Sequence, residues 1–120
     1  MLWSSRGVLD YRKSSLVLNI DQGLVEYYRS LIPRYKGVSC QAHRAHITLI
    51  RSFERCWLCG IISGEYNFVY SGEILFSFPY YYLRCWGSEL NEIRRSWGLG
   101  DYRFGYSSFH ITLGNVKSPE

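Results

Sequence analysis

The tetrapeptide His-Ile-Thr-Leu occurs twice in the chain, at residues 46–49 and 110–113. The chain contains three histidines and only two threonines, against fifteen serines, and both threonines lie two residues after a histidine inside this repeat. On a β-strand, residues i and i+2 project from the same face. Each repeat is therefore expected to present one imidazole and one hydroxyl on one face, and its isoleucine and leucine on the other.

Two histidines on matching strands can divide the proton transfers of one reaction. One of His46 and His110, when neutral, takes a proton from an attacking hydroxyl or water, while the other, when charged, gives one to the leaving oxygen. The hydroxyls of Thr48 and Thr112 can bind the non-bridging oxygens of a phosphate and hold the phosphorus between the rings. This scheme needs no metal ion or other cofactor. The alternative, an ordinary strand sequence that occurs twice, leaves the placement of both threonines unexplained.

The hydrophobic pattern predicts an α+β domain in which the two repeats lie on separate strands. The expected strands are residues 15–20, 45–51, 66–78, 80–86 and 108–116, and the expected helices are residues 22–32 and a segment that runs from Ser88 to Gly98. The order is strand, helix, strand, then strand, strand, helix, strand. It predicts two similar halves, each with one helix on antiparallel strands.

Local signals predict where the two helices begin and end. Asp21 is expected to cap the first helix, and Pro33 to end it. Ser88 is expected to cap the N-terminus of the second helix, and Gly98 is expected to be its C-cap. The second helix is expected to bury Leu90, Ile93 and Trp97 and to turn Arg94 and Arg95 toward solvent.

Paired His-x-Thr motifs in a small two-lobed α+β domain resemble the 2H phosphoesterase superfamily. The chain looks most like the phage-encoded "Swiss Army Knife RNA repair-like" branch of that superfamily. The resemblance covers most of residues 15–117. The segments that carry it are EYYRSLIPRY (26–35), AHITLIR (45–51), YLRCWGSELNEIR (82–94) and FHITLGNVK (109–117).

The resemblance implies a bilobal, pseudo-twofold 2H phosphoesterase fold with antiparallel sheets, one main helix per lobe and the site in the central cleft. It implies that His46 and His110 are the catalytic pair and that Thr48 and Thr112 are the phosphate-binding pair. Members of the superfamily act on 2′,3′-cyclic phosphates, 2′–5′ linkages or cyclic oligonucleotides. The phage anti-CBASS phosphodiesterases share the two-motif arrangement in a comparably short chain, and they cleave cyclic di- and trinucleotide alarm signals.

The favoured interpretation is therefore a metal-independent phosphodiesterase that cleaves cyclic nucleotides or cyclic oligonucleotides, as a phage anti-defence enzyme. The chain has no room for the accessory RNA-binding elements of larger members, which favours a compact substrate. An RNA end that carries a 2′,3′-cyclic phosphate is the alternative substrate. A sponge that binds a nucleotide without cutting it is the alternative from the binding class. Two opposed acid/base groups argue against a sponge, because binding alone does not need them.

Five further residues are candidates for substrate binding. Arg51 ends the first motif strand, and strict alternation puts it on the face opposite the motif histidine unless the strand bends. A solvated strand end and a phosphate contact are thus both open for Arg51. Tyr102, Arg103 and Tyr106 lie in the loop just before the second motif, and loops beside a site often carry binding residues. Tyr11 is a candidate for stacking on a base, with ordinary packing as the alternative.

The third histidine, His43, belongs to a cysteine and histidine pattern that is the strongest alternative functional signal in the chain. Cys40-x2-His43 and Cys56-x2-Cys59 have spacings that a zinc site can use. The two pairs flank the strand at 45–51, whose ends lie ~20 Å apart when extended. Both flanking loops would have to fold back to share one ion. A solvated His43 with reduced thiols is the favoured interpretation, and no metal site is predicted.

Length and composition limit the domain count, the partners and the location that can be expected for this protein. At 120 residues, the chain is expected to form a single domain, 1–120. A net charge of +4 is compatible with a phosphate-bearing partner but too small to argue for one. No apolar run approaches the ~18 residues of a membrane-spanning helix, and the N-terminus carries no signal-peptide core. No membrane partner is expected, the predicted location is the cytoplasm (of the host cell for a phage protein), and the oligomeric state stays open.

Overall fold

The computed structural model describes residues 1–12, 15–39, 44–51 and 63–116. The chain begins with two strands, a helix and a short 3-10 helix, and four further strands follow before the second helix. The elements are β1 (Leu2–Arg12), β2 (Ser15–Asn19), α1 (Gln22–Ser30), η1 (Arg34–Lys36), β3 (His46–Ile50), β4 (Glu65–Ser71), β5 (Leu75–Ser77), β6 (Tyr80–Trp86), α2 (Ser88–Ser96) and β7 (Phe109–Asn115). This confirms the predicted α+β class.

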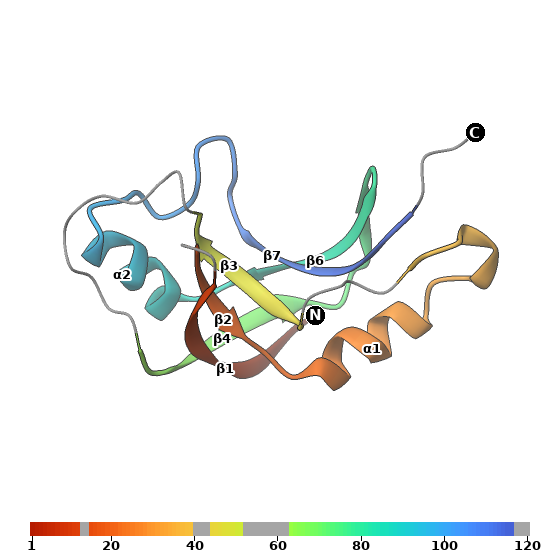
Figure 1. Ribbon diagram of the computed structural model, residues 1–120, viewed down its shortest axis with the longest axis horizontal. Helices are drawn as coiled ribbons and strands as arrows, with labels where there is room; N and C mark the ends of the chain where they lie inside the picture. Colours follow the sequence, from red (N-terminus) through yellow and green to blue (C-terminus); the bar gives the residue numbers. More distant parts are fainter. Residues whose placement is uncertain (13–14, 40–43, 52–62, 117–120) are drawn as a thin grey trace.

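The strands of both halves form one continuous antiparallel sheet in the order β4-β1-β2-β3-β7-β6-β5. A further pairing between β4 and β6 closes the sheet on itself. The second edge of β6 is shared, because β5 pairs with Tyr80–Tyr82 and β4 pairs with Cys85 and Trp86. The two motif strands, β3 and β7, are neighbours near the middle of the order (Figure 1).

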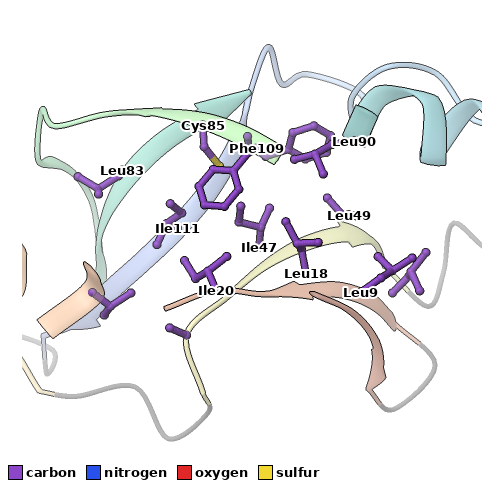
Figure 2. Close-up of a cluster of buried hydrophobic side chains, with 14 of the residues drawn as sticks. Leu9, Leu18, Ile20, Ile47, Leu49, Leu83, Cys85, Leu90, Phe109 and Ile111 are labelled. Atoms are coloured by element: carbon purple, nitrogen blue, oxygen red, sulfur yellow. The ribbon is translucent and has the colours of Figure 1, made fainter. Parts of the chain in front are cut away.

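The core lies inside the curve of this closed sheet. Figure 2 shows side chains from β2 and β3 pointing toward side chains from β6 and β7. The isoleucines and leucines of both tetrapeptides belong to this cluster, and their exposed fractions are 0–1%. The apolar half of each repeat therefore packs into the core as predicted, which leaves the histidines and threonines on the outer face of the sheet.

The elements repeat along the chain as strand, strand, helix, strand: β1-β2-α1-β3 and then β5-β6-α2-β7. The two helices lie at opposite ends of the molecule (Figure 1). Helix α1 packs against β7, the motif strand of the other half, and α2 packs against β3 as well as β4. Each half thus supplies the helix that covers the other half's motif strand. In the described residues, neither helix is long and apolar enough to cross a membrane.

Strand β1 was not expected from the sequence. Residues 2–6 are mostly exposed, so they lack the one-sided apolar pattern of a core strand. Pairing on both edges, with β2 and with β4, holds the strand in the sheet. Gly7 is needed here, because a Cβ at this position would lie 2.6 Å from the carbonyl oxygen of Asn19.

The ends of the helices agree with the predictions at two of four points. Asp21 caps α1 and accepts a hydrogen bond from the Gly23 amide at 3.0 Å, and the chain leaves the helix before Pro33. The C-cap of α2 is Trp97, one residue before the predicted Gly98, and Gly98 takes the left-handed conformation with φ +79°. The predicted Ser88 cap is wrong. Gly87 is the N-cap, and a Cβ there would crowd the Asn67 carbonyl oxygen at 3.0 Å.

The expected long strand at 66–78 is two strands. Strand β4 ends at Ser71 and pairs with β1, whereas β5 begins at Leu75 and pairs with β6. A two-residue turn with a cis Phe78–Pro79 peptide joins β5 to β6. The alternation of the segment continues across the break, but only its first part pairs with β1, whereas both parts pair with β6.

Candidate active site

The two identical tetrapeptides lie side by side in opposite directions. Ile47 of β3 pairs with Ile111 of β7, which are the equivalent residues of the two motifs, and both are fully buried. Because neighbours of a matched pair in an antiparallel ladder also lie opposite each other, one histidine and the threonine of the other motif come together at each end. The arrangement has a local twofold symmetry about the Ile47–Ile111 pair.

Each motif strand also contains a β-bulge at the same place in its tetrapeptide. The pairs are Val17–Thr48 followed by Leu16–Ile50 between β2 and β3, and Tyr82–Thr112 followed by Tyr81–Gly114 between β6 and β7. Leu49 and Leu113 are therefore the extra residues. Because an extra residue reverses the alternation beyond it, the chain after each motif faces the opposite way from that predicted by strict alternation.

The bulge in β3 places Arg51 at the site. Beyond Leu49, the strand buries Ile50 and turns Arg51 to the face that carries Thr48. The bend that the sequence analysis left open is thus present. Thr48, Arg51 and His110 line a pocket of about 70 Å³. The remaining lining residues are Leu49, Arg94, Arg103, Tyr106, Ser108 and Phe109.

A second, narrower pocket holds the other ends of the two motifs. His46 and Thr112 line it together with Gln22, Val25, Arg29, Arg44 and Ala45. We call the pair Thr48 and His110 the first half-site, and the pair His46 and Thr112 the second half-site. Each half-site combines the histidine of one motif with the threonine of the other. No acidic residue lines either pocket in the described part of the chain, so both favour an anion.

The ring of His46 is oriented by a backbone carbonyl. Its Nδ1 lies 2.7 Å from the carbonyl oxygen of Arg44, and Arg12 Nη1 approaches the same oxygen at 3.3 Å. A carbonyl oxygen only accepts hydrogen bonds, so Nδ1 carries a proton. Arg12 Nη1 and His46 Nδ1 lie 3.3 Å apart because both donate to the same acceptor, the Arg44 carbonyl oxygen. The neutral ring therefore has its basic lone pair on Nε2.

A polar network behind His46 was missed by the sequence analysis. Arg12 Nη2 donates to Asn19 Oδ1, and Asn19 Nδ2 donates to Asp10 Oδ2 at 3.1 Å. Hydrogen bonds from the Tyr11 amide and from Asn19 lower the pKa of Asp10 below its ordinary value, against the opposing effect of burial. Asn19 lies opposite His46 in the β2–β3 register. No sequence signal marks this network, because β1 itself was not expected.

His110 lies between two tyrosine rings. The ring centroids of Tyr82 and Tyr106 are 5.0 Å and 5.2 Å from that of the imidazole, both edge to face. Burial, and then the positive charges of Arg51, Arg103 and Arg84, lower the pKa of His110 below its ordinary value of 6.5. His110 is thus held in its neutral form near neutral pH, packed against two tyrosine rings and beside three guanidinium groups.

Arg84 was not singled out from the sequence, although alternation along β6 could have found it. It lies opposite His110 in the β6–β7 register and stacks over the Trp86 ring at 5.5 Å. In the described part of the chain, its Nε is buried and has no hydrogen-bond acceptor. A buried donor without an acceptor is costly.

Only two of the three substrate-binding residues predicted in the loop between α2 and β7 lie at the site. Arg103 stacks on Tyr106 at 4.5 Å and donates from Nη2 to its hydroxyl at 2.9 Å, and both line the first half-site pocket. Tyr102 instead packs against the core residue Phe109 at 5.2 Å. Tyr11 shares a face of the sheet with its partner Leu16, the face opposite the motif histidines and threonines.

The prediction that Arg94 faces solvent is wrong. Arg94 is 3% exposed, and its guanidinium donates to two backbone carbonyls, those of Leu49 at 2.7 Å and Gly100 at 2.8 Å. Its neighbour Arg95 does face solvent and pairs with Asp101 at 2.9 Å. Helical spacing alone did not reveal that α2 abuts β3 on the face that carries Arg94.

Metal-binding residues do not gather in the described part of the chain: no three His, Cys, Asp or Glu side chains there lie close enough to hold one ion. The alternative zinc set weighed from the sequence, Cys40, His43, Cys56 and Cys59, lies outside the described residues. Cys85 is a free, buried cysteine of the core, and burial raises the pKa of its thiol well above the ordinary value.

Replacing Arg103 by methionine is expected to raise the pKa of His110, because one of the three positive charges that oppose protonation is removed. The measurement is an NMR titration of the imidazole signals. Arg95→Met is the matched control, since Arg95 pairs with Asp101 and does not act on His110. Equal shifts in the two variants, or a lower pKa in Arg103→Met, would contradict this account of the site.

Comparison of the chain with protein-family models, curated proteins and solved structures finds no match. The function must therefore be argued from the two half-sites themselves.

Proposed function

We propose that this protein is a metal-independent phosphodiesterase in which His46 and His110 act as acid and base on a cyclic nucleotide or cyclic oligonucleotide. The observation that carries the proposal is the pairing of the two motifs at Ile47 and Ile111. It sets two imidazoles and two hydroxyls on one face of the sheet, among arginines and without a carboxylate in the described pocket linings.

The reaction divides between the two histidines. One ring takes the proton of the attacking ribose 2′-hydroxyl or water as the new P–O bond forms, and the other protonates the leaving oxygen as the old P–O bond breaks. The hydroxyls of Thr48 and Thr112 donate to the non-bridging oxygens and fix the phosphorus between the rings. Arg51 and Arg103 stabilise the negative charge on these oxygens in the transition state.

We assign the role of base to His110 and the role of acid to His46. His110 is held neutral by burial and by three guanidinium groups, as a base must be before it accepts a proton. The Nδ1–H of His46 is committed to the Arg44 carbonyl, which is a contact that the charged ring also makes. Proton transfer to the leaving group then falls to Nε2 of His46.

The size of the first half-site pocket favours a phosphate group as the part of the substrate that enters. About 70 Å³ is far below the ~300–1,000 Å³ of pockets that enclose whole drug-sized ligands. A nucleobase must then lie outside the pocket, beside Tyr106, whose side chain is 46% exposed. This matches a small phosphodiester ligand that spans the two half-sites and leaves its bases at the rim.

We further propose that the fold is the bilobal 2H phosphoesterase fold and that the protein is a phage anti-defence enzyme. The repeated β-β-α-β units, the matching bulges and the motif pairing support a pseudo-twofold domain of this kind. Each unit would correspond to one lobe, with the strands of both lobes continuous through β3 and β7.

The test is incubation with 3′,3′-cyclic GMP–AMP in EDTA, followed by chromatography of the products. Linear products are expected. The His46→Ala/His110→Ala double variant serves as the control for contaminating nucleases, because it lacks both acid/base groups. Activity in that variant would show that the product comes from another source.

Two other results would redirect the proposal. Recovery of unaltered ligand from a stable complex, after denaturation, would identify a sponge and overturn the catalytic role. Failure to bind or cleave the cyclic dinucleotide, with cleavage of an RNA end that bears a 2′,3′-cyclic phosphate, would keep the chemistry and replace the substrate.

A further inference from the structure

The bulges leave one carbonyl in each motif strand in need of a donor. Leu49 and Leu113 are the extra residues of the two bulges, and an extra residue is left out of the regular ladder of hydrogen bonds. Both residues are buried, where a carbonyl without a donor is costly. In each case an arginine supplies the donor: Arg94 Nη1 to Leu49 at 2.7 Å, and Arg29 Nη1 to Leu113 at 3.4 Å.

The two arginines occupy equivalent places in the internal repeat. Leu18 pairs with Ile47 of the first motif, and Leu83 pairs with Ile111 of the second. Arg29 follows Leu18 by eleven residues, as Arg94 follows Leu83. Each arginine lies on the helix of one half and reaches the bulge of the other half. The contacts therefore cross between the halves, as the helices do.

The two contacts differ in strength. Arg94 is 3% exposed and also donates from Nε to the Gly100 carbonyl at 2.8 Å, which ties the loop bearing Arg103 and Tyr106 to the first motif. Arg29 is half-buried, and its bond to Leu113 is the longer of the two. Arg94 also lines the first half-site pocket, and Arg29 lines the second.

We propose that Arg94 and Arg29 are a matched pair of positioning residues. Each holds the bulge of the motif in the opposite half, and thereby places the threonine of that motif against the histidine of the same half-site. Arg94 is the dominant member, because it positions Thr48 and the substrate loop together. The catalytic readout of this proposal rests on the proposed function, whereas the structural readout does not.

Arginine is the side chain that this role requires. Its planar guanidinium presents donors in several fixed directions, so Nε and Nη1 of Arg94 reach carbonyls on two separate elements. A lysine keeps the positive charge but concentrates its donors on one nitrogen at the end of a flexible chain. Arg94→Lys therefore removes the double contact and retains the charge, and Arg29→Lys is its matched partner in the other half.

The first experiment compares ¹H–¹⁵N spectra of the whole chain and the two lysine variants, and needs no activity. Arg94→Lys is expected to shift the amides of Thr48, Ile50 and the loop of Arg103, and to leave Thr112 in place. Arg29→Lys is expected to shift Thr112 and Gly114 and to leave Thr48 in place. Changes confined to each variant's own helix, or equal changes in both motifs, would overturn the proposal.

The second experiment measures cleavage of the cyclic dinucleotide. Arg94→Lys is expected to lower kcat by about tenfold with little change in KM, since a misplaced threonine affects the transition state more than binding. Arg29→Lys is expected to lower kcat by about twofold. A loss of rate that only follows the unfolded fraction, measured by thermal melting, would show a purely structural role. If the unaltered chain cleaves nothing, the proposed function fails, and the amide pattern still decides the positioning role.

Discussion

Replacing His110 or His46 by alanine is expected to lower kcat for phosphodiester cleavage by ~10²–10⁴ in either case, the usual contribution of one acid/base group. Each imidazole is half-buried on the outer face of the sheet, whose inner face carries the fully buried pair Ile47 and Ile111. Removal of either ring therefore leaves the core intact. The measurement is steady-state kinetics, with a thermal melt of each variant to verify that it folds.

Three control variants sharpen this prediction. Thr48→Ala and Thr112→Ala are expected to be milder, at about tenfold each, because each removes one hydrogen bond to the phosphate and no proton transfer. His43→Ala removes the histidine that stands outside the repeat and is expected to retain activity. Cleavage that survives the loss of either motif histidine would falsify the two-imidazole mechanism.

Replacing Ile111 by alanine is expected to destabilise the protein by about 2–5 kcal/mol, the usual cost of such a truncation in a packed core. Ile111 is fully buried. Its pairing with Ile47 is the only residue pair in register between β3 and β7 in the described residues. A typical domain is stable by ~5–15 kcal/mol, so this loss is a large share of the total. Urea unfolding followed by circular dichroism measures it.

Two comparisons test whether the contact, and not the loss of apolar atoms in general, is responsible. Leu2→Ala makes a similar truncation at a side chain that is 57% exposed, and it is expected to change stability by no more than ~0.5 kcal/mol. A double-mutant cycle of Ile47→Ala and Ile111→Ala is expected to show a coupling of ~0.5–3 kcal/mol. Additive effects, or equal losses at Leu2 and Ile111, would contradict the central role of this pair.

The chemistry-bearing residues could be found from the sequence because the repeat is local. The alternation of His-Ile-Thr-Leu depends only on the two-residue period of a strand. In the structure, the isoleucines and leucines of both repeats are buried, and the histidines and threonines are half-buried. Asp21 and Gly98 were likewise predictable, since a cap and a left-handed turn depend on a few neighbouring residues.

Features that depend on a distant partner were not predictable. Strand β1 exists because β2 and β4 pair with its two edges. Arg94 reads as a solvent-facing helix residue until α2 is placed beside the Leu49 carbonyl. Gly87 takes the cap position expected for Ser88, at a place where the Asn67 backbone would crowd a side chain. In each case the deciding neighbour is remote in sequence.

The sequence by itself determined which residues stand on the outer face of the motif strands and that there are two equivalent sets of them. Only the tertiary structure decided how the sets meet: the antiparallel pairing at Ile47 and Ile111 and the bulges after each threonine join every histidine to the threonine of the other motif. Strand register and bulges arise from pairing between segments far apart in the chain. No local pattern can therefore specify them, although the residues that they bring together can be recognised in advance.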